Sequence, residues 1–211
     1  MDEPKQLVRR LLKVAGTTYA SEAGVRISDK PMPLFQLLVL CMLASKPIDA
    51  TIAMHAGHEL FADGLRTPKA VLASDRPTMI RAFGRAHYVR YDESSATRLV
   101  DISERVRDEY SGDLRELARR SEHDVRVTTR MLKQFKGIGD TGADIFLREV
   151  QDVWPWVRPY FDKRAIAGAK KLGLPADPTE LGRLAPGDNA RLAAALVRAS
   201  LDDDVGRQLS G

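Results

Sequence analysis

Residues 135–146, with the sequence FKGIGDTGADIF, place two glycines around a single isoleucine. Segments with helical periodicity lie on both sides, so Gly137, Ile138 and Gly139 predict a tight turn between two helices. Glycine lets the backbone turn sharply, and a turn that leads into a helix amino terminus presents N–H groups to an anion. One glycine would make the turn, and the other would clear the approach for a nucleic-acid phosphate.

The residues around this turn leave two interpretations open. Lys133 and Lys136 add positive charge close to the glycines, which favours a phosphate. Glycine-rich turns also join helices that bind nothing, because a sharp corner needs conformational freedom. The short motif alone therefore predicts the helix–turn–helix corner but does not decide its role.

The elements that must position this turn are helical. Apolar residues recur at spacings of three and four along most of the chain, and no convincing alternating strand is present. Thr67, Asp124 and Pro178 stand where helix caps or a first-turn proline belong. The pattern predicts an all-α protein of ten or more short helices. Residues 34–44 should form the most buried one, because they are apolar nearly all round.

Composition narrows the classes of protein. The 211 residues carry 33 Lys and Arg against 29 Asp and Glu, a net charge of +4 that leans mildly towards polyanionic partners. A single cysteine, Cys41, excludes an internal disulfide and a four-cysteine metal or iron–sulfur site. The longest apolar run, residues 34–44, is too short to cross a bilayer. We therefore expect a soluble cytoplasmic protein with no membrane partner.

The ordered set of segments resembles the endonuclease III-like superfamily of helix-hairpin-helix DNA glycosylases, in its iron–sulfur-free branch. Residues 33–52 look like the family's first buried helix and the turn after it. Residues 82–106 look like its glycine turn and following helix, and residues 156–174 look like its active-site loop and next helix. The resemblance covers residues 34–174.

The resemblance implies a two-lobed helical fold with an active-site cleft between the lobes. Residues 34–150 would form a six-helix-type domain that ends in the hairpin. Residues 1–33 and 151–211 would together form the second domain. No iron–sulfur cluster or other cofactor is expected.

The family's essential aspartate corresponds to Asp162, 23 residues after Gly139. In the family it stabilises the oxocarbenium charge or activates water as the N-glycosidic bond of a flipped-out nucleotide breaks. An aspartate before a helix is also a standard cap, so Asp162 has a structural interpretation as well. The lysine that gives some relatives a strand-cleaving activity is replaced by Thr141, so the resemblance implies a monofunctional enzyme.

Further positions follow from the resemblance. Lys46 stands where relatives push a wedge into the DNA stack, although it could simply be a solvated turn residue. Arg85, His87, Arg90 and Arg98 follow the glycine turn at Gly84, where relatives touch DNA, although nearby carboxylates would also suit an ordinary solvated helix. The candidates for the base pocket are Asp49, Trp154, Trp156 and Tyr160. The aromatic members offer a π face to an extruded base, but they could instead pin an irregular loop to the core.

No metal site is expected. His55 and His58 lie three residues apart on a helical segment, but no carboxylate or cysteine stands at a convincing spacing. They are better interpreted as helix-surface histidines.

The leading expectation is therefore a base excision repair glycosylase that acts as a cytoplasmic, nucleoid-associated monomer on double-stranded DNA with a damaged or mismatched base. One alternative keeps the fold and the DNA grip but lacks catalysis. Another is an unrelated helical scaffold in which the hairpin is only a turn; it predicts no salt-dependent DNA affinity.

Overall fold

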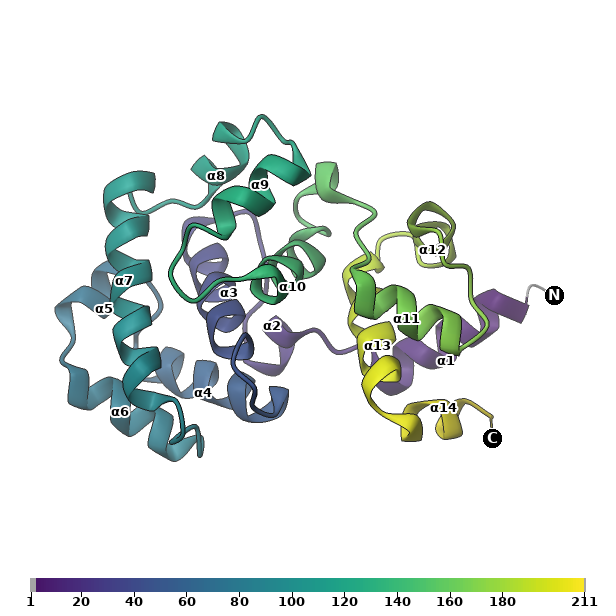
Figure 1. Cartoon of the computed structure of the whole chain (residues 1–211), viewed down its shortest axis with the longest axis horizontal. Helices are drawn as coiled ribbons and strands as arrows, with labels where there is room; N and C mark the ends of the chain where they lie inside the picture. The colour runs from purple at the N-terminus through teal and green to yellow at the C-terminus, as the bar shows by residue number, and fades with distance from the viewer. Residues whose placement is uncertain (1–2, 211) are drawn as a thin grey trace. The chain divides into compact units, whose positions relative to one another are not determined.

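The computed structural model describes residues 3–210. Within this range the chain forms fourteen α-helices and one short 3-10 helix, and it contains no strand (Figure 1). The all-α prediction is therefore confirmed. None of the helices in the described range is both long and apolar enough to cross a membrane.

The helices fall into two compact units. The inner unit runs from Tyr19 to Phe146, and the terminal unit combines the residues up to Thr18 with those from Leu147 onward. The sequence had predicted the domain boundaries at 33/34 and 150/151. Residues 1, 2 and 211 of the predicted second domain lie outside the described residues. Residues 19–33 belong to the inner unit, where α2 (Tyr19–Glu22) packs against α4 (Ala50–Ala62). Ala20 of α2 is buried.

The inner unit is built around one apolar helix. Every residue from Pro33 to Leu43 of α3 is buried, as its sequence predicted. Helices α4 and α7 pack directly against it. The remaining bounds are α3 (Pro31–Ala44), α4 (Ala50–Ala62), α5 (Pro68–Ala73), α6 (Arg76–Arg85), α7 (Asp92–Tyr110), α8 (Arg115–Arg120), α9 (Val125–Leu132) and α10 (Asp140–Val150), the last of which continues into the terminal unit.

Local signals fixed several of these boundaries. The side chains of Thr67 and Asp124 cap α5 and α9 by accepting hydrogen bonds from the N–H groups of Ala70 and Val127. Gly84, expected in the turn, is the penultimate residue of α6. The chain turns instead after Arg85, where Ala86 closes the helix and His87 adopts a left-handed conformation with a φ of 58°.

A buried tyrosine ties α7 to the end of α3. The Tyr88 hydroxyl donates to the Leu43 carbonyl at 3.0 Å and accepts from Ser95 at 3.3 Å. Burial raises the pKa of Tyr88 from 10.0 to about 12. The neutral phenol is therefore favoured in the folded protein.

The inner unit should lose stability as pH rises from about 10 to 12. In that window the unfolded state has released the Tyr88 proton and the folded state retains it, so the free energy of unfolding falls by roughly 2 kcal/mol. Urea unfolding followed by circular dichroism at several pH values measures this. Tyr88→Phe should show a shallower decline, and identical declines in the two proteins would contradict the assignment.

The terminal unit joins both ends of the chain. Helix α13 lies at its centre and packs against α1, α11 and α14 (Figure 1). Arg198 on α13 donates to the carbonyl of Ala15, and Arg191 donates to that of Gly16, so polar contacts also link the two ends. The bounds are α1 (Glu3–Ala15), η1 (Pro155–Val157), α11 (Lys163–Lys171), α12 (Pro178–Leu184), α13 (Asn189–Leu201) and α14 (Asp203–Ser210).

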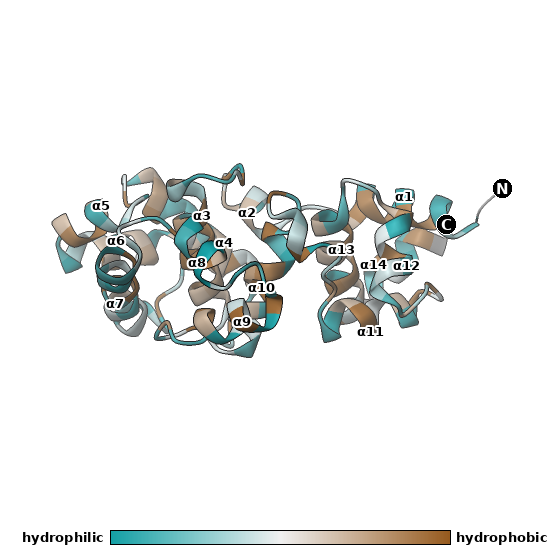
Figure 2. Cartoon of the chain, turned by 90° about the horizontal axis from the view of Figure 1, so that it is seen from above, coloured by the Kyte–Doolittle hydropathy of each residue, from teal (hydrophilic) through white to brown (hydrophobic). Residues whose placement is uncertain are grey.

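Both units bury the apolar side of amphipathic helices. Helices such as α1, α9 and α11 carry alternating hydrophobic and hydrophilic residues along the ribbon (Figure 2). In the terminal unit the apolar residues gather in one core to which α1, α11, α12, α13 and α14 all contribute. Helical periodicity thus explains the core of each unit.

Candidate nucleic-acid interface

The predicted hairpin lies between α9 and α10. Helix α9 ends at Leu132, and α10 begins at Asp140. Gly137 has a φ of 92°, a conformation that strains any residue with a side chain. Ile138 is only 4% exposed, and its N–H donates to the Phe135 carbonyl at 3.0 Å. Gly137 therefore makes the turn, and Ile138 anchors it in the inner unit.

Gly139 has a different environment from Gly137. Its φ lies outside the left-handed region, and a Cβ there would meet nothing within 4 Å. Nothing in the described chain therefore requires glycine at this position. The N–H groups of Gly139 and Thr141, at the start of α10, donate no hydrogen bond within the described residues. An open surface beside a helix amino terminus suits an anion.

The two hairpin lysines are exposed and already have carboxylate neighbours. Lys133 Nζ lies 2.5 Å from Asp140, and Lys136 Nζ lies 3.3 Å from Asp101. Asp101 also pairs with Arg98 at 2.9 Å. Ion pairs between exposed side chains are worth at most about 1 kcal/mol, so phosphate can replace the carboxylate partners. The carboxylates nevertheless reduce the net positive charge of the hairpin.

The turn after α3 reaches the hairpin. A Cβ on Gly142 would lie 2.7 Å from the Ser45 hydroxyl, so the small glycine allows α10 to approach that turn closely. Lys46, the expected wedge position, follows Ser45 and is half-buried, with its Nζ 5.7 Å from the centre of the Tyr91 ring. Arg90 lies over the same ring at 5.4 Å.

These contacts join segments far apart in the sequence into one surface, which we call the hairpin surface. Its basic members are Lys46, Arg90, Arg98, Lys133 and Lys136. Sequence reasoning identified all five as candidate DNA contacts. It did not single out the stacking of Arg90 and Lys46 on Tyr91, because residue types alone do not show which ring a cation will cover.

Arg85 and His87 have other surroundings. Arg85 donates to Glu59 and Asp63 at the end of α4, and its hydrogen bond holds the pKa of Glu59 below its usual range. His87 is exposed at the turn after α6. Within the part of the chain that the structure describes, neither side chain makes a hydrogen bond or ion pair with the hairpin.

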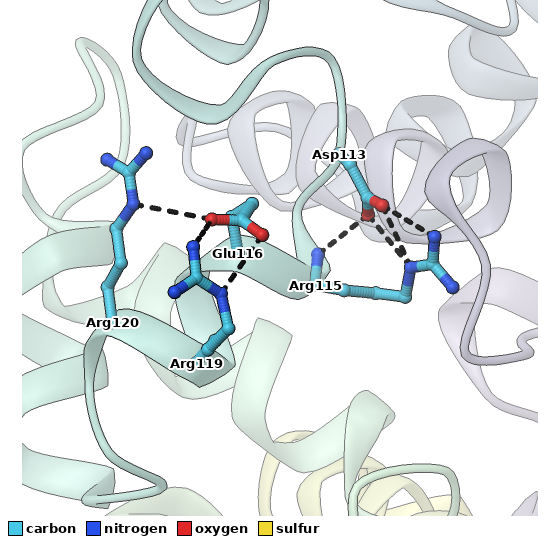
Figure 3. Close-up of polar contacts among 5 residues, drawn as sticks. All are labelled: Asp113, Arg115, Glu116, Arg119 and Arg120. Atoms are coloured by element: carbon cyan, nitrogen blue, oxygen red, sulfur yellow. Dashed lines mark hydrogen bonds and ion pairs between the residues drawn. The ribbon is translucent and has the colours of Figure 1, made fainter.

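The arginines of α8 are likewise held by carboxylates. The Arg115 side chain makes three hydrogen bonds to Asp113, and Arg119 and Arg120 both pair with Glu116 (Figure 3). Their charge is largely offset locally. The α8 cluster is therefore a weaker candidate for a phosphate than the hairpin surface.

In the terminal unit, Asp162 occupies the cap position of α11. Its Oδ1 accepts from the Ala165 N–H at 2.9 Å, and its Oδ2 accepts from Arg148 Nη1 at 2.6 Å. Both side chains of the ion pair are only 3% exposed. The carboxylate is thus buried, caps α11 and is neutralised by Arg148. The sequence interpretation had missed this arginine partner.

A buried glutamine fixes the loop that leads to Asp162. Gln151 donates to the carbonyls of Arg148 and Tyr160 and accepts from the Tyr160 N–H at 2.8 Å. Trp154 is buried and stacks on Trp156, with ring centroids 5.3 Å apart. The sequence left two interpretations of these aromatic residues open. This arrangement favours the one in which they hold an irregular loop against the core.

The remaining candidates are accounted for locally. Asp49 caps α4 by accepting from the Thr51 N–H at 2.8 Å, and it is exposed. His55 and His58 lie 6.3 Å apart on α4, and His55 pairs with Glu59. No group of three or more potential metal ligands occurs in the range that the structure describes.

Comparisons of this chain with family models, with curated proteins and with solved structures found no match.

Proposed function

We propose that this protein binds double-stranded DNA through the hairpin surface, with contacts to the phosphate backbone rather than to base edges. One observation carries the proposal. The hairpin leaves the N–H groups of Gly139 and Thr141 open at a helix amino terminus, the exposed Lys133 and Lys136 flank the turn, and Gly142 packs against Ser45, next to Lys46. Backbone N–H groups and lysines are common phosphate partners, and neither depends on base sequence.

The charges favour duplex DNA over a small anion. The five basic side chains come from the turn after α3, from residues 90–98 and from the hairpin, so they can meet several phosphates at once. Each neutralised phosphate releases counterions, which makes affinity strongly salt-dependent. Arg90 and Lys46 beside Tyr91 add an aromatic face next to the cations.

Lys136→Gln should weaken duplex binding and flatten its salt dependence. Loss of one phosphate contact should lower the slope of log affinity against log salt by about 1. Fluorescence anisotropy with a labelled 20-base-pair duplex over a range of potassium chloride concentrations measures both quantities. The substitution should leave the fold intact, because Lys136 is exposed and its one described contact is an ion pair.

Lys69→Gln is the matched control, since Lys69 is an exposed lysine on α5 outside the hairpin surface. It should leave the slope unchanged. Equal effects of the two substitutions would mean that binding is a general consequence of positive charge. Absence of salt-dependent affinity in the unmodified protein would support the helical scaffold instead.

DNA glycosylase activity is a second candidate, favoured by the placement of Asp162 at the amino terminus of α11 directly after an aromatic loop. The Arg148 partner counts against it, because a buried carboxylate that already pairs with a guanidinium is a weak stabiliser of developing positive charge. Duplexes carrying single lesions, incubated with the protein and then treated with alkali, distinguish the candidates. Cleavage that depends on alkali and disappears in Asp162→Asn would establish a monofunctional glycosylase.

A further inference from the structure

A second site lies at the other end of α3 from the hairpin surface. Here a pocket of about 330 Å³ opens between the first turns of α3, the end of α4 and the loop after α2. Its volume is at the low end of small-molecule sites, which begin at about 300 Å³. Apolar walls come from Val25, Met32, Pro33, Phe61 and Ala62, and polar side chains come from Arg26, Gln36, His58 and Arg66.

Gln36 is the unusual member of this set. It is the one polar residue in the buried stretch from Pro33 to Leu43, and it is 7% exposed. Its amide makes no hydrogen bond with any residue in the described range. Because Gln36 lines the pocket, a ligand there can satisfy both its N–H donors and its carbonyl acceptor.

The charge around the pocket is positive. Arg66 donates from its Nε to the Phe61 carbonyl at 2.7 Å, and the residue is exposed. Arg26 is exposed and makes no hydrogen bond or ion pair within the described chain. No carboxylate is among the lining residues. The positive end of the α3 dipole adds to the preference for an anion.

We infer that this pocket binds a nucleoside monophosphate. The base would lie against Phe61 and pair through its hydrogen-bonding edge with the Gln36 amide, as glutamine pairs with the N6 and N7 atoms of adenine. The phosphate would face Arg26 and Arg66, whose guanidinium groups suit phosphate oxygens. The inference is independent of DNA binding, because no lining residue belongs to the hairpin surface.

Isothermal titration calorimetry of the full chain with AMP tests the inference. One saturable site is expected, and adenosine and inorganic phosphate used separately should each bind at least about tenfold more weakly, because each keeps only one of the two recognition elements. Gln36→Leu should weaken AMP binding by about tenfold, and Arg26→Gln by several-fold. Gln36→Leu keeps the side-chain volume and suits an apolar helix, so the fold should persist.

Two further variants locate the bound ligand. Arg81→Gln removes an exposed arginine from α6, outside the pocket, and should leave AMP affinity unchanged. Lys136→Gln should also bind AMP normally, since a loss there would place the nucleotide on the hairpin surface. The inference is overturned if AMP does not bind, if Gln36→Leu binds it as well as the unmodified protein does, or if phosphate alone binds equally well.

Discussion

Gly168→Ala should destabilise the terminal unit by about 3 kcal/mol or more, at the upper end of the range for an overpacked site. A Cβ at this position would lie 1.9 Å from the Leu196 carbonyl oxygen and 2.7 Å from its carbonyl carbon. Both atoms belong to the backbone of α13, so no rotation of a side chain can relieve the clash. Helices α11 and α13 would have to separate, which would open the core that they share with α1.

Urea unfolding followed by tryptophan fluorescence measures this effect in the right unit, because both tryptophans of the chain, Trp154 and Trp156, belong to it. Gly206→Ala is the matched control. Gly206 lies within α14 of the same unit, and a Cβ there would meet nothing within 4 Å. Alanine should be neutral or stabilise that helix by about 0.5–1 kcal/mol. Similar stability in the two variants would show that α11 and α13 do not pack this closely.

The Gly168 contact marks the boundary of what the sequence could predict about the fold. The apolar pattern predicted α3 and its burial, because a helix that is apolar on every side is stable only in the core. The segment AIAGAKK around Gly168 also predicted a helix, α11. Nothing local shows which backbone a glycine faces, since that depends on how distant segments pack. The division of the chain at Thr18 rather than near residue 33 has the same origin.

The candidate site shows the same contrast between local and distant contacts. The hairpin was predictable because the turn, its anchor and the following helix lie within a dozen residues, and Gly137 needs its left-handed conformation whatever surrounds it. The cap formed by Asp162 was also predictable from its place before a helix. The Arg148 partner was not, because Arg148 lies in the last turn of an amphipathic helix, where an arginine is usually solvated.

Arg148→Met should destabilise the terminal unit by about 3–5 kcal/mol, because it leaves the Asp162 carboxylate buried without its charged partner. Asp162→Asn should also destabilise the unit, since it retains an acceptor for the Ala165 N–H but leaves the guanidinium uncompensated. The double variant should recover part of the loss. Tryptophan fluorescence during urea unfolding gives all three values, and their combination gives the coupling between the two side chains.

Arg119→Met provides the control, because its pair with Glu116 is on the surface, where such pairs contribute less than about 1 kcal/mol (Figure 3). A large coupling for Arg148 and Asp162 together with a small effect at Arg119 would establish a structural role for the aspartate. If Arg148→Met instead left stability unchanged, the carboxylate would be independent of its partner and available for chemistry. Loss of lesion cleavage in Asp162→Asn without loss of stability would then identify it as the catalytic group.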